Sequence, residues 1–195
     1  MREIGACPDP IECPQRIESI MWQHRGNQRP DFAIEPEPDQ ESVWDYPRPP
    51  ALVPYDRWVE VKAGTQPIAL SKRCFRVLET ASPPTFYIPP DDIDLHALIP
   101  TGGSSFCEWK GMAQYWALKD DFNDSESNSR AIGWSYPDAS GRFAEIRDWL
   151  SFYPSRIECY VDGVRVTAQA GEFYGGWITP NIVGPCKGDP GTSHW

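Results

Sequence analysis

Two stretches of the chain alternate apolar and polar residues, and a short turn sequence interrupts each of them. Residues 58–70 contain Ala63-Gly64-Thr65-Gln66 near their middle, and residues 157–168 contain Asp162-Gly163. Alternation with a period of two is typical of a strand with one buried face, and Asp-Gly tolerates the positive φ of a two-residue hairpin turn. The pattern therefore predicts two β-hairpins.

One segment has the spacing of a helix. Its apolar residues recur at helical intervals after Ser140 and Gly141, and they are Phe143, Ile146, Trp149 and Leu150. Pro154 cannot continue a helix because it lacks the backbone N–H group. We predict one helix near residues 142–152. Elsewhere the apolar runs are short and Gly and Pro are frequent, so the predicted fold class is mainly β.

The length and the distribution of proline indicate the domain organisation. A chain of 195 residues has the size of one compact domain. Residues 1–40 are acidic and rich in Pro, which neither continues a helix nor pairs within a sheet. We predict an extended N-terminal arm over this segment, with a short docking helix at residues 15–24, and a single β-rich domain over residues 41–195. The polar run from Lys119 to Arg130 is expected to be an exposed hairpin tip or loop.

The two halves of the chain share several short motifs in the same order. Trp44-Asp45-Tyr46-Pro47 corresponds to Trp134-Ser135-Tyr136-Pro137, Phe86-Tyr87 to Phe173-Tyr174, and the segment from Cys107 to Gly111 to Cys186-Lys187-Gly188. The two predicted hairpins occupy matching places between these motifs. This order indicates an internal pseudo-repeat that would place equivalent loops around a shared centre.

The net charge narrows the choice of partners. Lys and Arg number 18 and Asp and Glu number 28, which gives a net charge of −10. Such a protein repels a phosphate backbone, so nucleic acid is not an expected partner. The sequence contains no apolar run of the length that a signal peptide or a membrane span needs, and we expect a cytoplasmic protein that does not enter a membrane.

Cysteine and histidine usage indicates neither a metal site nor a catalytic triad. No two of the six cysteines are spaced Cys-x-x-Cys, and we expect free thiols rather than a zinc site or a disulfide framework. Cys7 and Cys13 could bind a metal only with ligands from elsewhere in the chain. His24, His96 and His194 stand in loop-like segments and offer no base for a His-dependent triad. We therefore predict no metal site, and the sequence leaves the cofactor unknown.

The densest group of reactive side chains is Cys107-Glu108-Trp109-Lys110-Gly111. A thiolate stabilised by a neighbouring ammonium is a nucleophile, and a lysine desolvated among aromatic rings acts as a base or holds an anion. If the segment is extended, Glu108 and Lys110 share one face. The alternative interpretation is a small buried cysteine beside a solvated strand face.

Two acidic segments are further candidates. Glu79 stands shortly before a proline-rich segment that contains Tyr87. It could pair with Arg48 or Lys110, act as a general base, or be a plain surface residue. Asp92-Ile93-Asp94 resembles a paired-carboxylate metal site, but acidic residues at such a place are more typical of the start of a helix.

Two glycine-dense stretches follow at residues 175–179 and 184–192. Exposed backbone N–H groups together with Lys187 could cradle an anion, although the spacing is not that of a nucleotide-binding P-loop. Tight turns that close a sheet explain the same glycines. Both interpretations stay open at the level of the sequence.

A larger set of motifs extends from about Glu41 to Trp195. It comprises Val43 to Pro50, Val77 to Thr80, Pro83-Pro84 with Tyr87 to Pro89, Cys107 with Lys110-Gly111, Trp134 to Pro137, Phe152 to Pro154, and Phe173 to Thr179 followed by Lys187-Gly188 and Pro190 to Thr192. In this order the motifs resemble those of the domain-of-unknown-function 427 family, which also carries a nucleotidyltransferase-like label.

The resemblance implies a single compact domain of curved antiparallel sheets around a pocket. The implied topology is similar to the β-tent of type B methionine sulfoxide reductases and of the cereblon ligand-binding domain, or to a β-barrel. The zinc of those relatives is held by two Cys-x-x-Cys pairs that this chain lacks, so neither the metal nor its chemistry is implied here. Where the family has Phe before Lys-Gly, this chain has Cys186, and no function is assigned to that thiol.

Together, the motifs and the resemblance lead to one hypothesis for a site. Its pocket walls are Tyr87, Trp109 and Trp177, its anion-holding residues are Arg48 and Lys187, and its catalytic residues are Glu79, Lys110 and Cys107, the first two of which transfer a proton.

The expected ligand is a small molecule, and the expected function is that of a binding protein or a non-metal enzyme acting on an anionic metabolite. One alternative is nucleotidyl transfer, for which Asp92 and Asp94 are the only paired carboxylates available to Mg²⁺. Another is a structural or interaction module that uses the N-terminal arm as its contact segment. The sequence does not indicate an oligomeric state.

Overall fold

The computed structural model describes residues 23–119, 130–171 and 173–195, and the chain in these ranges is mainly β, as predicted. The strands are β1 (Glu41–Ser42), β2 (Ala51–Tyr55), β3 (Val59–Ala63), β4 (Gln66–Ser71), β5 (Cys74–Glu79), β6 (Ser82–Tyr87), β7 (Leu98–Pro100), β8 (Phe106–Cys107), β9 (Gly111–Met112), β10 (Gln114–Leu118), β11 (Gly133–Ser135), β12 (Ser151–Phe152), β13 (Glu158–Val161), β14 (Val164–Arg165), β15 (Thr167–Ala168), β16 (Trp177–Ile178) and β17 (Ile182–Val183). The short 3-10 helices are η1 (Val43–Asp45), η2 (Pro90–Asp92), η3 (Leu95–Ala97) and η5 (Gly141–Ile146).

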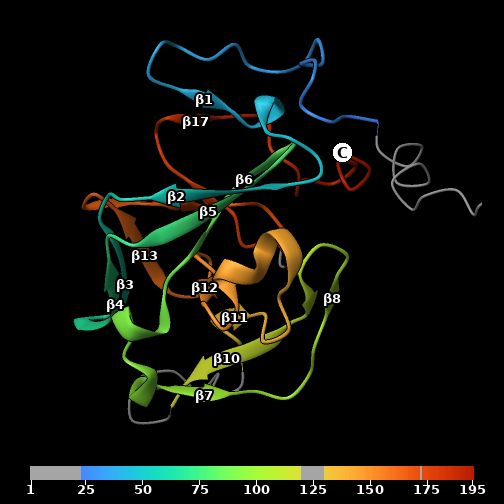
Figure 1. Ribbon diagram of the computed structural model, residues 1–195. Coiled ribbons are helices and arrows are strands. Elements are labelled where there is room, and N and C mark those ends of the chain that lie inside the picture. The colour runs from blue at the N-terminus through green and yellow to red at the C-terminus, as the bar shows by residue number, and fades with distance from the viewer. Residues whose placement is uncertain (1–22, 120–129, 172) are drawn as a thin grey trace, which may run out of the picture.

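The strands form several small sheets, and nearly all pairs are antiparallel. One sheet has the order β2-β5-β6, and two larger sheets have the orders β14-β13-β3-β4 and β12-β11-β10-β7. The remaining pairs are β8-β9, β15-β16 and the parallel pair β1-β17. In Figure 1 the β1-β17 pair lies at one end of the molecule, β7 and β10 lie at the other, and β2, β5 and β6 lie between them. No sheet within the described ranges closes on itself, so the barrel expectation is wrong and the sheets are open.

Both predicted hairpins are present and lie side by side in one sheet. Strands β3 and β4 turn at Gly64-Thr65, and β13 and β14 turn at Asp162-Gly163, where both residues have positive φ. Strand β3 pairs with β13 in the antiparallel sense, with Val61 opposite Cys159. The two hairpins are therefore related by an approximate two-fold axis through the sheet. Outside this sheet the correspondence weakens, because Trp44 lies in the 3-10 helix η1 and Trp134 lies in strand β11.

The predicted helix at residues 142–152 is present in a shorter and tighter form. It is the 3-10 helix η5, which ends at Ile146 rather than near Pro154. The backbone of Arg147 leaves the helical region with a ψ of 128°, and Asp148 adopts a φ of 63°. Leu150 then exchanges backbone hydrogen bonds with Ile88, which draws the chain into the sheet region instead of a further helical turn.

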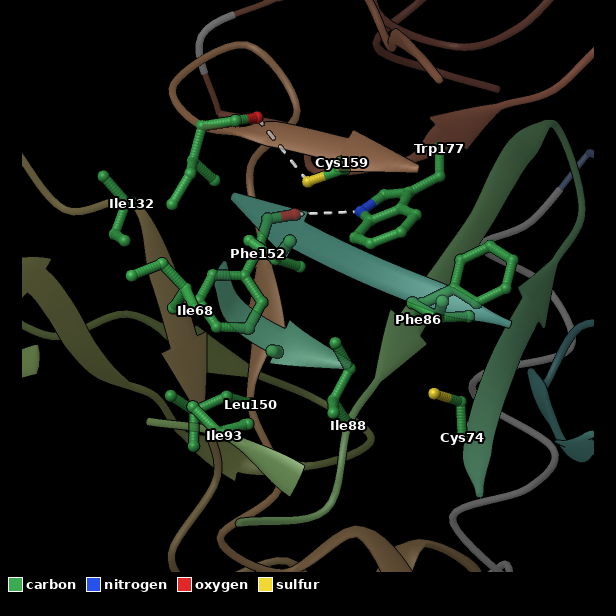
Figure 2. Packing of buried hydrophobic residues seen from close by; sticks show 14 of the residues in the cluster. Ile68, Cys74, Phe86, Ile88, Ile93, Ile132, Leu150, Phe152, Cys159 and Trp177 are labelled. Atoms are coloured by element: carbon green, nitrogen blue, oxygen red, sulfur yellow. Dashed lines mark hydrogen bonds between the residues drawn. The ribbon is translucent and has the colours of Figure 1, made fainter. Parts of the chain in front are cut away.

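The main hydrophobic core lies between the β14-β13-β3-β4 sheet and strands β6, β12 and β16, and Figure 2 shows part of it. Trp177 is fully buried there, with its ring 4.9 Å from that of Phe86. Its indole N–H donates a hydrogen bond of 2.9 Å to the backbone carbonyl of Phe152. A large ring with its polar atom satisfied is a stable core element. Trp177 therefore joins strand β16 to strand β12.

The described part of the predicted arm packs against the domain through an aromatic cluster. The Phe32 ring stacks on Trp195 at 5.1 Å and meets Trp44 edge-on, and His24 also meets Trp44 edge-on at 5.1 Å. The Ile34 N–H donates to the carbonyl of Gly184. Residues 23–34 thus lie on the β1-β17 end of the molecule (Figure 1). The domain boundary at residue 40 stays a prediction.

Several sequence predictions concern residues outside the described ranges. They are most of the helix at residues 15–24, the thiols of Cys7 and Cys13, and most of the polar run from Lys119 to Arg130. Within the described ranges, no helix has the length and apolar character needed to cross a membrane.

The four cysteines of the described ranges, Cys74, Cys107, Cys159 and Cys186, are free thiols, as predicted. Burial raises the pKa of Cys74 to about 12. Burial and the charge of Asp189 raise the pKa of Cys186 to about 11. The thiolate is the reactive form, so these two thiols are unreactive at neutral pH.

Candidate functional site

A cavity of about 210 Å³ lies beside strand β6, on the side opposite the main core. Side chains of a strand alternate between its two faces. In β6, Phe86 accordingly points into the main core, whereas Pro83, Thr85 and Tyr87 line the cavity. Seven aromatic residues contribute to the wall, and they are Tyr87, Tyr115, Trp134, Tyr136, Tyr153, Phe173 and Tyr174. The charged residues of the lining are Glu79, Lys110 and Lys187.

Glu79 is the last residue of β5, and a buried arginine fixes its position. Its carboxylate forms an ion pair with Arg48, with 3.2 Å between Oε1 of Glu79 and Nε of Arg48. The Arg48 side chain is almost entirely buried. Arg48 also donates a hydrogen bond of 2.8 Å to the carbonyl of Thr80. Arg48 is not among the residues that line the cavity, so it supports Glu79 from behind.

Lys110 reaches the cavity from the turn of the β8-β9 hairpin. The segment is not extended, because the Lys110 N–H donates to the carbonyl of Cys107 and Gly111 adopts a φ of 89°. This turn leaves Glu108 exposed and buries Lys110, which is only 8% exposed. The Lys110 ammonium lies 5.3 Å from the ring centre of Tyr136, within the range of a cation–π contact.

The electrostatic surroundings keep Lys110 protonated. Burial is the largest single influence and lowers the pKa of Lys110, but Tyr87, Cys107 and Glu79 together outweigh it, and the pKa of Lys110 is raised above its ordinary value. An ammonium that stays charged at neutral pH is suited to holding an anion and poorly suited to accepting a proton.

Lys187 contributes the second ammonium from the segment after β17. It donates a hydrogen bond of 3.0 Å to the carbonyl oxygen of Trp195 and lies 5.8 Å from the ring centre of Tyr174. Burial lowers the pKa of Lys187, and the positive charge of Arg48 lowers it further. The two lysines of the cavity therefore have pKa values that are shifted in opposite directions.

The aromatic wall is a connected structure built around Trp134. Its indole N–H donates a hydrogen bond of 3.2 Å to the hydroxyl of Tyr87, and its ring lies 4.5 Å from that of Tyr153. A side chain at position 175 would bring a Cβ within 2.2 Å of the Trp134 ring, so Gly175 permits this close approach. Burial raises the pKa of Tyr87, which keeps its hydroxyl neutral at physiological pH.

A profile of a domain of unknown function, DUF427, matches residues 51–163 of the chain. The chain belongs to the DUF427 family. No curated protein matches the sequence.

The DUF427 match contains one part of the cavity wall and excludes another. Glu79, Tyr87, Lys110 and Trp134 fall within residues 51–163. Lys187 comes from the following segment, as do Phe173 and Tyr174. The cavity of this DUF427 protein is therefore assembled from the family region together with the segment that follows it.

The structure brings together four of the eight residues that the sequence analysis selected. Four of them line the cavity, and they are Glu79, Tyr87, Lys110 and Lys187. The other four, Arg48, Cys107, Trp109 and Trp177, are not among the lining residues.

Cys107 interacts with both Lys110 and Tyr136 from behind the lining. Trp109 is half-buried and packs against the aromatic cluster around the cavity. Trp177 lies in the main core, on the opposite side of β6. Cys107 therefore interacts with a charged residue of the cavity although it does not line the cavity itself.

Sequence reasoning did not assign six aromatic lining residues to the site, namely Tyr115, Trp134, Tyr136, Tyr153, Phe173 and Tyr174. A signal existed for five of them. Trp134 and Tyr136 belong to the repeated Trp-x-Tyr-Pro motif, Tyr153 to the Phe-Tyr-Pro motif, and Phe173 and Tyr174 form the repeated Phe-Tyr pair. Tyr115 lies outside all the motifs named in the sequence analysis.

The acidic pair at residues 92 and 94 does not face the cavity. Asp92 pairs with Arg73 and accepts a hydrogen bond from Ser71. Asp94 caps η3 by accepting from the backbone N–H of His96, as expected for an acidic residue that begins a helix. In the described part of the chain, no group of three or more His, Cys, Asp or Glu residues is arranged to hold a metal ion.

Proposed function

We propose that this DUF427 protein binds a small organic anion in the cavity formed by Glu79, Lys110, Lys187 and the surrounding aromatic rings. One observation supports the proposal most directly. Two lysine side chains line a cavity of about 210 Å³. Among the described lining residues, Glu79 has the only carboxylate, and that carboxylate is already ion-paired with Arg48. Positive charge in a partly enclosed space attracts a counter-anion strongly, because water screens it poorly there.

Cationic side chains line the cavity although the whole chain has a net charge of −10. An anion would therefore be drawn to Lys110 and Lys187 and repelled from much of the remaining surface.

The side chains have separate roles in this proposal. Lys110 and Lys187 bind the anion, and Arg48 holds Glu79 in place. Lys110 is assigned to binding rather than to proton transfer because its pKa is raised. Glu79 is the carboxylate that reaches the ligand, and it is the candidate group for accepting a proton from it.

Thermal-shift measurements with matched small molecules test the proposal. We expect acetate, pyruvate and benzoate to raise the melting temperature in a concentration-dependent way, since a ligand that binds only the folded state stabilises it. Neutral acetamide and cationic choline should leave the melting temperature unchanged. The proposal fails if no organic anion stabilises the protein, or if all of them stabilise the Lys110→Met and Lys187→Met variants as much as the wild type.

The opposite pKa shifts of the two lysines predict a distinctive pH dependence. An anion binds most tightly while both ammonium groups are charged. As the pH rises above 7, Lys187 loses its proton first because its pKa is lowered, whereas Lys110 keeps its charge because its pKa is raised. Anion affinity measured by calorimetry should therefore fall in a first step below the ordinary pKa of lysine.

The Lys187→Arg variant is the control for this assignment, because arginine keeps its charge throughout the range. In that variant the first step should disappear while the later loss of affinity remains. An unchanged pH profile would assign the step to another group.

A further inference from the structure

We infer that the anion is an aromatic carboxylate with a single ring, bound with its carboxylate at Lys110 and Lys187 and its ring against Trp134 and Tyr153. This inference rests on the proposed function and names the class of ligand for the same cavity. The volume and the nature of the wall support it independently.

The volume favours a single ring. Pockets for drug-sized ligands have volumes of roughly 300 to 1,000 Å³, and this cavity has about 210 Å³. A six-membered ring with a carboxylate suits this volume better than a nucleotide does.

The wall favours an aromatic ring over an aliphatic one. The Trp134 and Tyr153 rings are tilted by 48° at a centroid distance of 4.5 Å, and Tyr87 meets Trp134 edge-on. Aromatic rings prefer such offset and edge-to-face contacts, and these contacts favour a ring ligand beyond the area that it buries. Tyr174 adds a half-buried ring beside Lys187.

Calorimetric titration with four probes tests the inference. The probes are benzoate, cyclohexanecarboxylate, acetate and benzamide. Benzoate should bind about three- to tenfold more tightly than cyclohexanecarboxylate, which has similar size and charge but no π system. Acetate should bind more weakly than both, and benzamide, which has the ring without the charge, should not bind measurably. In proton NMR spectra, contact with the aromatic wall should shift the ring protons of benzoate.

The Tyr174→Leu variant provides a matched check, since this side chain is only half-buried and its loss should not prevent folding. The preference for benzoate over cyclohexanecarboxylate should decrease, while acetate affinity stays the same. Equal affinity for benzoate and cyclohexanecarboxylate in the wild type would overturn the inference and leave the proposed function standing. No binding by any of the three carboxylates would overturn both.

Discussion

Replacing Lys110 with Met should weaken the binding of benzoate by about tenfold to hundredfold. A hydrogen bond that involves a charged group contributes about 1.5 to 3 kcal/mol, which corresponds to this range of affinity. Met keeps the apolar stem of the lysine as far as Cε. It lacks the Nζ atom, which lies 5.3 Å from the ring centre of Tyr136 and 5.4 Å from that of Phe143. Calorimetric titration of the purified variant measures the effect directly.

Lys72→Met is the matched control because it removes the same charge elsewhere. Lys72 is exposed, lies over the ring of Trp58, and does not line the cavity. Its replacement should leave benzoate affinity unchanged. A folded Lys110→Met variant that binds benzoate as tightly as the wild type would contradict the role of Lys110. If that variant does not fold, Lys187→Met carries the same test from the other side of the cavity.

Replacing Trp177 with Ala should lower the free energy of unfolding by about 3 to 5 kcal/mol, the usual cost of removing a large buried ring. The side chain is fully buried, packs on Phe86, and donates to the carbonyl of Phe152. Truncation therefore leaves a cavity and also removes the hydrogen-bond donor of that carbonyl. Urea denaturation followed by circular dichroism measures the loss.

Two further variants separate a core role from a site role for Trp177. Trp177→Phe should retain much of the stability and should bind benzoate like the wild type. Trp109→Ala should cost less stability than Trp177→Ala, since Trp109 is only half-buried. A Trp177→Phe protein that is stable but no longer binds benzoate would place Trp177 in the site after all.

Local patterns predicted the parts of this fold that depend on neighbouring residues. The two hairpins follow from alternating burial and from turn residues that accept positive φ, and both signals lie within a few positions of each other. The position of the short helix was also visible in the spacing of Phe143 and Ile146. Its early end was not, because the departure after Ile146 is tied to backbone hydrogen bonds between Leu150 and the distant Ile88.

The site was harder to predict because it depends on contacts between distant segments. Residue type marked Glu79, Lys110 and Lys187 as candidates, but only the packing of β5, the β8-β9 turn and the last segment puts them around one cavity. Residue type also could not show that Trp177 belongs to the main core and Trp134 to the cavity wall. One lies on each side of β6, and the side is decided by sheet order rather than by local sequence.

A crystal structure of the protein soaked with benzoate tests the central claim most directly. We expect density for a flat ring beside Trp134 and Tyr153, with its carboxylate within hydrogen-bonding distance of the ammonium groups of Lys110 and Lys187. Benzoate found only at other places on the surface, with this cavity filled by ordered water at saturating ligand, would contradict the account.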